Sequence, residues 1–318
     1  MSARRPIVLY VDRGFDHRPI ADALAGELDA REAVGPGEAG DVVAIVTGAV
    51  PIGRDEVAPY PALRAVVTCT IGTDHIDVAG LVERGIVVRN TPTYCTGEVA
   101  DHALACVLAG WRGLLALDAA VRGGSWDYAA AGLLRRADAS CLGIVGLGRI
   151  GRALAARARA LGIAVVAHDP YAGAGEVELV ALDELLARAD AISLHLPWTP
   201  GPPPLIGARE LALMRPGAVL VNLARPGVVD LDALGAALRD GRLAAAFWDV
   251  WPQEPPVLPD PRLDAPRLVV TPHAAWYSAQ AEAAYYEEAI AALREALLGD
   301  GEPHRRTSRA GPGRGLTP

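Results

Sequence analysis

Three side chains in the second half of the chain could act together on a carbonyl group, namely Arg225, Glu254 and His273. An arginine offers a planar, permanently charged fork that can bind a carboxylate and polarise a carbonyl oxygen. A histidine can give or take a proton near neutral pH, and a carboxylate beside it would orient its ring and raise its pKa. The three residue types suit proton and hydride chemistry on a 2-oxo acid, provided that a hydride carrier binds beside them.

Each of these residues also has a plainer interpretation. Arg225 could be a surface residue, Glu254 a loop charge between prolines, and His273 a histidine at the edge of the core. Their joint placement favours the catalytic interpretation, because each follows an apolar run that predicts a strand: VLVNLA, FWDVWPQ and VVTP. Ligands of open parallel sheets bind at the carboxyl ends of the strands.

The hydride carrier is indicated by residues 141–151, CLGIVGLGRIG, where Gly146, Gly148 and Gly151 have the spacing G-x-G-x-x-G. An apolar run precedes them and a helical segment follows, so a pyrophosphate would lie at a helix N-terminus. The next apolar run ends at Asp169, whose carboxylate can bond both ribose hydroxyls and would repel a 2′-phosphate. The glycine spacing alone is weak evidence, but the strand, turn, helix, strand and acid together predict NAD rather than NADP.

Strands and helices alternate in two stretches of the chain, which predicts an α/β fold of two doubly wound parallel-sheet domains. In the first stretch, apolar runs predict strands, and a helix is predicted over Asp16–Ala30. The strands predicted there are Ile7–Val11, Val42–Val46, Ala65–Thr68 and Ile86–Arg89. The second stretch predicts six strands near 142–146, 164–168, 190–194, 218–222, 244–249 and 268–271.

Two long helical segments set the domain borders. Glu98–Trp111 would link the stretches, with Leu114–Arg122 continuing as helix, and Tyr277–Leu298 would cross back to pack on the first unit. The polar, Gly- and Pro-rich end of the chain predicts disorder. We therefore expect one domain of residues 1–97 plus 281–300, a second domain of residues 98–280, and a disordered tail over 301–318.

Composition excludes several classes of function. The 318 residues carry a net charge of −8 and no lysine, which argues against a nucleic-acid partner and excludes Schiff-base and Walker A lysines. Four cysteines without C-x-x-C spacing indicate reduced thiols and no metal site. Apolar runs fall short of the roughly 18 residues of a membrane span, and the N-terminus has no signal-peptide pattern. We expect a cytoplasmic protein with no membrane partner.

The segments GIVGLGRIG with Asp169, LHLP, NLARPGVVD, DVWPQEP and TPHAAWYS resemble the D-isomer-specific 2-hydroxyacid dehydrogenase family, in this order and at similar intervals. The resemblance covers about residues 60–298. DHALACVL and TPHAAWYS are most similar to the C-terminal-binding-protein branch and its bacterial dehydrogenase relatives. The family implies a flavodoxin-like substrate domain, a Rossmann NAD domain, and a homodimer formed around Leu114–Arg122 and residues 123–139.

The resemblance also implies a role for each matching position. Arg225 would bind the substrate carboxylate, His273 would be the acid or base, and Glu254 would be its partner. Backbone amides of Ile71 and Gly72 would hold the carboxylate, and Trp276 would line the pocket for the substrate side chain. The implied cofactor contacts, from pyrophosphate and ribose to adenosine and nicotinamide, are Gly146, Gly148, Arg149, Ile150, Gly151, Asp169, His195, Pro197, Thr96, Ala224 and Asp249.

The chain departs from the family pattern at two places beside the predicted site. Pro226 stands where glycine is usual, which removes one N–H and restricts Arg225 to extended backbone. Trp248 stands where a smaller aliphatic residue is usual and could crowd the nicotinamide. In the predicted substrate loop, Cys69–Asp77, Gly72 could permit close approach of a ligand, or the segment could be a plain turn capped by Asp74.

Other functions remain open. The C-terminal-binding branch includes NAD-binding dimers that recruit peptides, so a scaffold with little turnover is the alternative to an enzyme. A formate dehydrogenase is disfavoured, since that branch has glutamine where Glu254 stands. A phosphorylated substrate would need a basic cluster, and the candidates for it are Arg54, Arg64, Arg89 and Arg112.

Overall fold

The computed structural model describes residues 5–11, 16–35, 37–173, 175–199 and 201–298, and the chain divides into two compact units. Unit 1 consists of Met1–Tyr94 and Ala279–Pro318, and unit 2 of Cys95–Ser278. The predicted borders, after residues 97 and 280, lie slightly further along the chain than these. The tail predicted over 301–318 lies outside the described residues.

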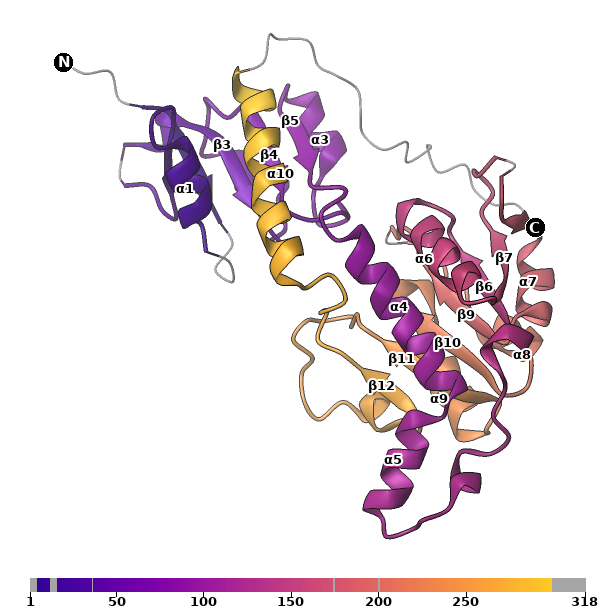
Figure 1. Ribbon diagram of the computed structural model, residues 1–318. Helices are drawn as coiled ribbons and strands as arrows, with labels where there is room; N and C mark the ends of the chain where they lie inside the picture. Colours follow the sequence, from indigo (N-terminus) through magenta and orange to yellow (C-terminus); the bar gives the residue numbers. More distant parts are fainter. Residues whose placement is uncertain (1–4, 12–15, 36, 174, 200, 299–318) are drawn as a thin grey trace. The chain divides into compact units, whose positions relative to one another are not determined.

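Unit 1 contains a five-stranded parallel sheet with the order β2-β1-β3-β4-β5, the flavodoxin-like arrangement (Figure 1). The inner strands are continuous apolar runs because helices cover both of their faces. The strands are β1 Ile7–Tyr10, β2 Asp29–Arg31, β3 Val42–Thr47, β4 Ala65–Thr68 and β5 Val87–Asn90. The helices are α1 Arg18–Leu24, α2 Arg54–Val57, α3 Val78–Glu83 and α10 Ala279–Leu298.

The helix predicted over Asp16–Ala30 is wrong in its second half. The helix ends at Leu24, and the edge strand β2 follows at Asp29–Arg31. This strand pairs only with β1, and its sequence Asp-Ala-Arg is half-buried throughout. It therefore lacks the apolar run or alternation by which a strand can be recognised.

Two apolar cores fill the faces of the sheet in unit 1. On one face α1 and α10 pack on the sheet, with Tyr285 and Leu293 among the buried residues of α10. The other core includes Leu81 of α3 and Val57 of α2. The C-terminal helix therefore completes the unit that the N-terminal residues begin.

Unit 2 contains a seven-stranded parallel sheet with the order β12-β11-β10-β9-β6-β7-β8. The six predicted strands are all present, and a seventh, two-residue edge strand was missed because so short a segment has no recognisable pattern. The strands are β6 Cys141–Val145, β7 Ala164–His168, β8 Glu178–Leu179, β9 Ala191–Leu194, β10 Ala218–Asn222, β11 Leu243–Trp248 and β12 Leu268–Val270. The helices are α4 Thr96–Trp111, α5 Leu114–Arg122, α6 Arg149–Ala160, α7 Leu182–Arg188, α8 Ala208–Leu213 and α9 Leu231–Arg239.

Helix α4 lies beside α6 and against β10 and β11, where it forms one layer of unit 2 (Figure 1). Close packing requires Gly110, since a Cβ atom there would lie 2.7 Å from Val219 on β10. The indole N–H of Trp111 donates to the Asp190 carbonyl at 3.2 Å and anchors the end of the helix. The opposite face of the sheet buries an apolar cluster that includes Leu185 of α7 and Leu234 of α9.

Helix α5 and the chain that follows it project from the sheet of unit 2 (Figure 1). The segment 123–139 contains two short 3-10 turns, Tyr128–Ala131 and Ala137–Ala139. Within the described residues, a single helix long and apolar enough to cross a membrane is not found. The helices α4 and α5 would pass such a test only as a pair bent by 58°.

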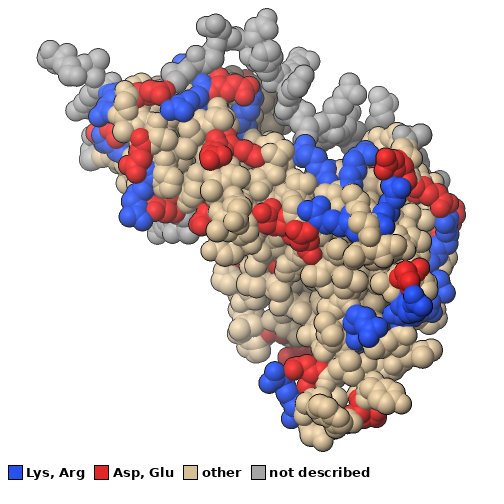
Figure 2. Space-filling view, viewed as in Figure 1, with Lys and Arg blue, Asp and Glu red and all other residues tan. Residues whose placement is uncertain are grey.

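Charges of both signs are interspersed on the visible surface of unit 2 (Figure 2). Arg188 pairs with Glu178 and Glu184, and Arg209 pairs with Asp183. Exposed pairs of this kind contribute little stability, so the core rather than surface charge holds the unit together.

Candidate active site

The glycine motif forms the turn between β6 and α6, and two of its glycines are sterically required. Gly146 has a φ of +95°, and a Cβ atom there would lie 2.2 Å from the His195 carbonyl oxygen. A Cβ atom on Gly151 would lie 2.2 Å from the Gly146 carbonyl oxygen. A Cβ atom on Gly148 would meet nothing within 4 Å, so this glycine leaves open space at the start of the helix.

The open space lies where α6 presents its first N–H groups. Gly148 is the N-cap, and Arg149 begins the helix, with both residues exposed and Ile150 partly buried. Helix N-terminal amides have no partner within the helix and favour an anion. The turn therefore fits the pyrophosphate of a dinucleotide, which Gly146, Gly148, Arg149, Ile150 and Gly151 would surround.

Asp169 is fixed beside this turn at the end of β7. Its Oδ2 atom accepts a hydrogen bond from the Leu147 amide at 2.8 Å, and its Oδ1 atom accepts one from the Tyr171 amide at 2.8 Å. A carboxylate can accept further bonds. Its position fits the ribose contact that the sequence predicts.

His195 and Pro197 follow β9, the strand beside β6. The His195 amide donates to the Val145 carbonyl at 2.8 Å, and its ring Nε2 lies 2.9 Å from the Ser193 hydroxyl. Burial lowers the pKa of His195 to about 4, so its ring is neutral at neutral pH. Pro197 is exposed two residues further on. His195 therefore borders the glycine turn from the neighbouring strand.

Arg225 lies in the loop after β10 and has extended backbone, with φ −143° and ψ 147°. Pro226 begins the following 3-10 turn, Pro226–Val228, so the proline fits the loop without altering it. Asn222 is completely buried and holds the loop with two hydrogen bonds. Its Nδ2 atom donates to the Arg225 carbonyl, and its Oδ1 atom accepts from the Ala224 amide. Asn222 belongs to the polar stretch 222–230 that the sequence places after this strand, but the sequence assigns it no role of its own.

Glu254 and His273 follow β11 and β12 and bond directly. The Nδ1 atom of His273 lies 2.6 Å from Oε2 of Glu254, and the Trp251 amide donates to Oε1 at 2.7 Å. Burial would raise the pKa of Glu254, but the hydrogen bonds from His273 and Trp251 and the charges of His273 and Arg225 outweigh it and lower that pKa. The structure thus brings His273 and Glu254 into contact, and Arg225 follows β10, the strand beside β11.

The His273 turn is held by Asp249 at the end of β11. Asp249 is 1% exposed, and its carboxylate accepts bonds from the Thr271 hydroxyl and from the amides of Ala274 and Ala275. His273 itself has a φ of 51°, which is uncommon for a residue other than glycine. Asp249, predicted only as a nicotinamide neighbour, therefore also positions the histidine.

Two further residues near these loops carry buried polar atoms. The hydroxyl of Thr96, at the start of α4, is buried and has no hydrogen-bond partner in the described part of the chain. A buried hydroxyl without a partner is consistent with a residue that forms a hydrogen bond to a ligand. The ring of Trp248 belongs to the apolar core of unit 2, where the residue is 1% exposed, and its indole N–H has no partner among the described residues.

The remaining predicted substrate residues lie in different units. Trp276 is in unit 2, three residues after His273, and packs edge to face on Tyr277 with ring centroids 5.4 Å apart. Ile71 and Gly72 are in unit 1, in the turn that follows β4. The residues predicted to hold the substrate are thus distributed over both units.

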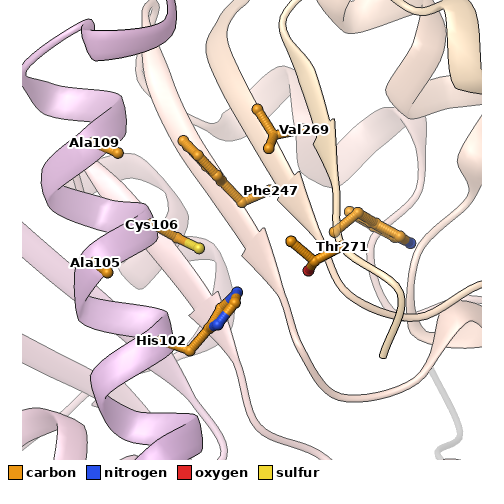
Figure 3. Close-up of a pocket in the computed structure, with 8 residues that line it drawn as sticks. His102, Ala105, Cys106, Ala109, Phe247, Val269 and Thr271 are labelled. Carbon is orange, nitrogen blue, oxygen red and sulfur yellow. The ribbon is translucent and has the colours of Figure 1, made fainter. Parts of the chain in front are cut away.

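A separate cavity of about 220 Å³ lies in unit 2 between α4 and the strands β11 and β12 (Figure 3). His102 and Cys106 of α4 face Phe247 and Thr271 across it (Figure 3). Burial and the charge of Asp249 raise the pKa of Cys106 to about 12, so this thiol is not a nucleophile at neutral pH. The cavity is smaller than typical ligand pockets of roughly 300 Å³ or more.

The cysteines and acidic residues give no sign of a metal centre. None of the four cysteines forms a disulfide, and three of them are buried. Within the residues that the structure describes, no group of three or more His, Cys, Asp or Glu side chains could hold a metal ion.

Comparison with known proteins places these features in context. Residues 104–275 match the family model "D-isomer specific 2-hydroxyacid dehydrogenase, NAD binding domain". A D-3-phosphoglycerate dehydrogenase of Mycobacterium leprae is 35% identical over 313 residues, covering 94% of this chain and 58% of that protein. The chain thus spans little more than half the length of this relative.

Two further similarities extend over most of both chains. A glycerate dehydrogenase of Methylorubrum extorquens is 38% identical over 248 residues, covering 73% of this chain and 75% of that protein. A D-lactate dehydrogenase from Aquifex aeolicus, solved with NAD and lactic acid, superposes with a TM-score of 0.83 at 26% identity. The superposition covers 96% of this chain and all of that one.

Proposed function

This chain belongs to the D-isomer specific 2-hydroxyacid dehydrogenase family, and we propose that it uses NAD(H) to interconvert a 2-oxo acid and a D-2-hydroxy acid. The observation that carries the proposal is the 2.6 Å contact between His273 Nδ1 and Glu254 Oε2. Arg225 stands at the end of the adjacent strand β10, and its positive charge favours the ionised form of the same carboxylate. A cation, an acid and a carboxylate at adjacent strand ends suit reduction of a carbonyl beside a carboxylate.

The glycine turn and Asp169 would hold NADH, which would supply the hydride that reduces the carbonyl carbon. Arg225 binds the substrate carboxylate and polarises the carbonyl, so that negative charge developing on its oxygen is stabilised. Because Nδ1 of His273 faces Glu254, the other ring nitrogen, Nε2, is left to donate a proton to that oxygen. In the reverse direction the same nitrogen accepts the hydroxyl proton.

The other predicted residues surround the ligands in this proposal. Amides of Ile71 and Gly72 hold the carboxylate, and Trp276 contacts the substrate side chain. The α6 turn binds the pyrophosphate, His195 and Pro197 border the adenosine, and the nicotinamide end lies near Thr96, Ala224 and Asp249. The buried, unpartnered hydroxyl of Thr96 supports its place in this set.

The ion pairs of the arginines in unit 1 support an unphosphorylated substrate in this proposal. Arg54 pairs with Glu83 and with Asp77 at 3.8 Å, and Arg89 lies 3.6 Å from Glu295. Arg64 directly precedes β4 and therefore stands at the opposite end of that strand from Ile71 and Gly72, and Arg112 ends α4 in unit 2. Within unit 1, Arg54 and Arg89 are therefore paired with acids, and Arg64 lies away from the predicted substrate loop.

The proposal includes a homodimer formed through α5 and residues 123–139. Large apolar side chains on this segment are exposed, including Trp126 at 91%, Tyr128 at 90% and Leu133 at 99%. Large exposed apolar side chains gathered on one segment mark an interaction surface. A second copy of the chain can cover two such segments in one symmetric interface.

Oxidation of NADH, followed at 340 nm with a panel of 2-oxo acids, tests the proposed activity. The panel runs from glyoxylate and pyruvate through phenylpyruvate to phosphorylated three-carbon acids, with NADPH in parallel. We expect turnover with an unphosphorylated acid, a D product, and preference for NADH because of Asp169. Binding of NADH without turnover of any acid would contradict the proposal and support the scaffold alternative.

A further inference from the structure

The turn after β4 has three consecutive carbonyl groups, and each of them accepts a hydrogen bond. The Thr91 amide donates to the Thr70 carbonyl at 3.3 Å. The side-chain amide of Asn90 donates to the Ile71 carbonyl at 2.7 Å, and the Thr70 hydroxyl donates to the Gly72 carbonyl at 2.6 Å. The donors therefore come from the end of β5 and from within the turn itself.

These bonds also fix the direction of the amide groups. In a planar trans peptide, the N–H of one residue points opposite to the carbonyl of the residue before it. The bond from Thr91 therefore turns the Ile71 N–H away from the end of β5, and the bond from Asn90 does the same for the Gly72 N–H. No intramolecular acceptor for either N–H is found among the described residues. Two neighbouring donors are thus directed outward together.

A chain of side-chain hydrogen bonds supports the Thr70 hydroxyl. The Thr68 hydroxyl, in a completely buried residue, lies 2.8 Å from that of Thr70 and 3.1 Å from Nε2 of His75. Thr70 gives its single proton to Gly72, and the single proton of Thr68 is within reach of both the Thr70 hydroxyl and the Gly48 carbonyl, which lies 3.2 Å away. The orientation of the turn is therefore set by side chains behind it.

We propose that Asn90 and Thr70 are positioning residues for the substrate carboxylate. Asn90 directs the Gly72 amide, and Thr70 holds the Gly72 carbonyl, so the turn offers its N–H groups in a fixed direction before the ligand arrives. The inference rests on the proposed function, in which the amides of Ile71 and Gly72 bind that carboxylate. Asn90 and Thr70 would thus preorganise the anion site without contacting the ligand themselves.

Kinetics of matched variants test this inference. Asn90→Leu removes the donor while keeping the side chain similar in size, and we expect the KM for the 2-oxo acid to rise about 10- to 100-fold. The dissociation constant of NADH and the melting temperature should stay near those of wild type. Thr70→Val should also raise this KM, whereas Thr70→Ser, which keeps the hydroxyl, should restore it. An unchanged KM in both Asn90→Leu and Thr70→Val would overturn the inference.

A binding experiment separates this inference from the proposed function. If wild type reduces none of the 2-oxo acids, the proposed function fails, and oxamate then serves as a carboxylate probe. Calorimetry of oxamate binding to the NADH complex should show weaker binding to Asn90→Leu and Thr70→Val than to wild type and Thr70→Ser. Equal binding to all four proteins, or no binding to wild type, would overturn the positioning role.

Discussion

The carboxylate of Asp249 holds the backbone that carries His273. Its Oδ1 and Oδ2 atoms accept bonds from the two amides that directly follow the histidine, at 2.8 and 2.9 Å, and Oδ1 also accepts from the Thr271 hydroxyl at 2.5 Å. A φ of 51° is energetically unfavourable for a histidine, and these hydrogen bonds hold the backbone of His273 in that conformation. A buried acid directly after β11 thus holds the turn after β12 that presents the imidazole to Glu254.

Removing the Thr271 hydroxyl should loosen this turn. In Thr271→Val the buried carboxylate of Asp249 keeps only its two amide donors, and we expect the free energy of unfolding to fall by about 1–3 kcal/mol. Turnover should fall as well, because His273 is less firmly placed. Thr271→Ser keeps the donor and is the control. Urea denaturation and steady-state kinetics measure both effects, and wild-type stability and turnover in Thr271→Val would contradict this role of Asp249.

The glycines of the motif should respond differently to alanine. Gly151→Ala places a methyl group against the Gly146 carbonyl and should lower the melting temperature by several degrees. Gly148→Ala has room for its methyl group and should fold normally, yet the methyl would occupy the space where a pyrophosphate approaches. We expect its affinity for NADH to fall about 10-fold or more. Calorimetry of NADH binding and thermal melts separate the cases, and tight NADH binding by Gly148→Ala would be evidence against this site.

Both sheets could be predicted from the sequence because their inner strands are buried on two faces and read as apolar runs. The edge strands β2 and β8 could not, since a half-buried Asp-Ala-Arg segment and a two-residue strand leave no such pattern. The positions of Arg225, Glu254 and His273 followed from the rule that parallel strands present their carboxyl ends at one edge. The supporting bonds of Asn90, Asn222 and Asp249 depend on loop conformation, which composition and periodicity do not encode.

Replacing Glu254 by glutamine should lower the rate of reduction. The Glu254 carboxylate contacts the ring of His273 and favours its charged form, and a neutral amide does not. In Glu254→Gln we therefore expect the maximal rate to fall roughly 10- to 100-fold.

The pH dependence follows from Glu254 itself. Burial would raise its pKa, but the hydrogen bonds from His273 and Trp251 lower it, so the carboxylate stays ionised as the pH falls towards the ordinary range of a glutamate. The rate advantage of wild type over Glu254→Gln should therefore persist at neutral pH and be lost only in acid, once the carboxylate is protonated. NADH oxidation by both proteins measures this difference, and equal rates at neutral pH would show that the carboxylate does not assist proton transfer.

Polar substitutions on the exposed segment should separate the proposed dimer. Trp126 and Leu133 are 91% and 99% exposed, and replacing both by serine removes apolar area that a second copy would bury. We expect mass photometry to show dimers for wild type and monomers for the double variant. Leu161→Ser, which removes an apolar side chain 50% exposed at the end of α6, is the control and should remain dimeric. A monomeric wild type would contradict the dimer.

The central claim, that His273 transfers the proton during reduction of a 2-oxo acid, is tested most directly by His273→Asn. Turnover with the best acid of the panel is measured at 340 nm, and NADH binding is measured on the same protein by calorimetry. We predict that turnover falls about 100- to 10,000-fold while NADH binds as tightly as to wild type. Turnover equal to that of wild type would contradict the account.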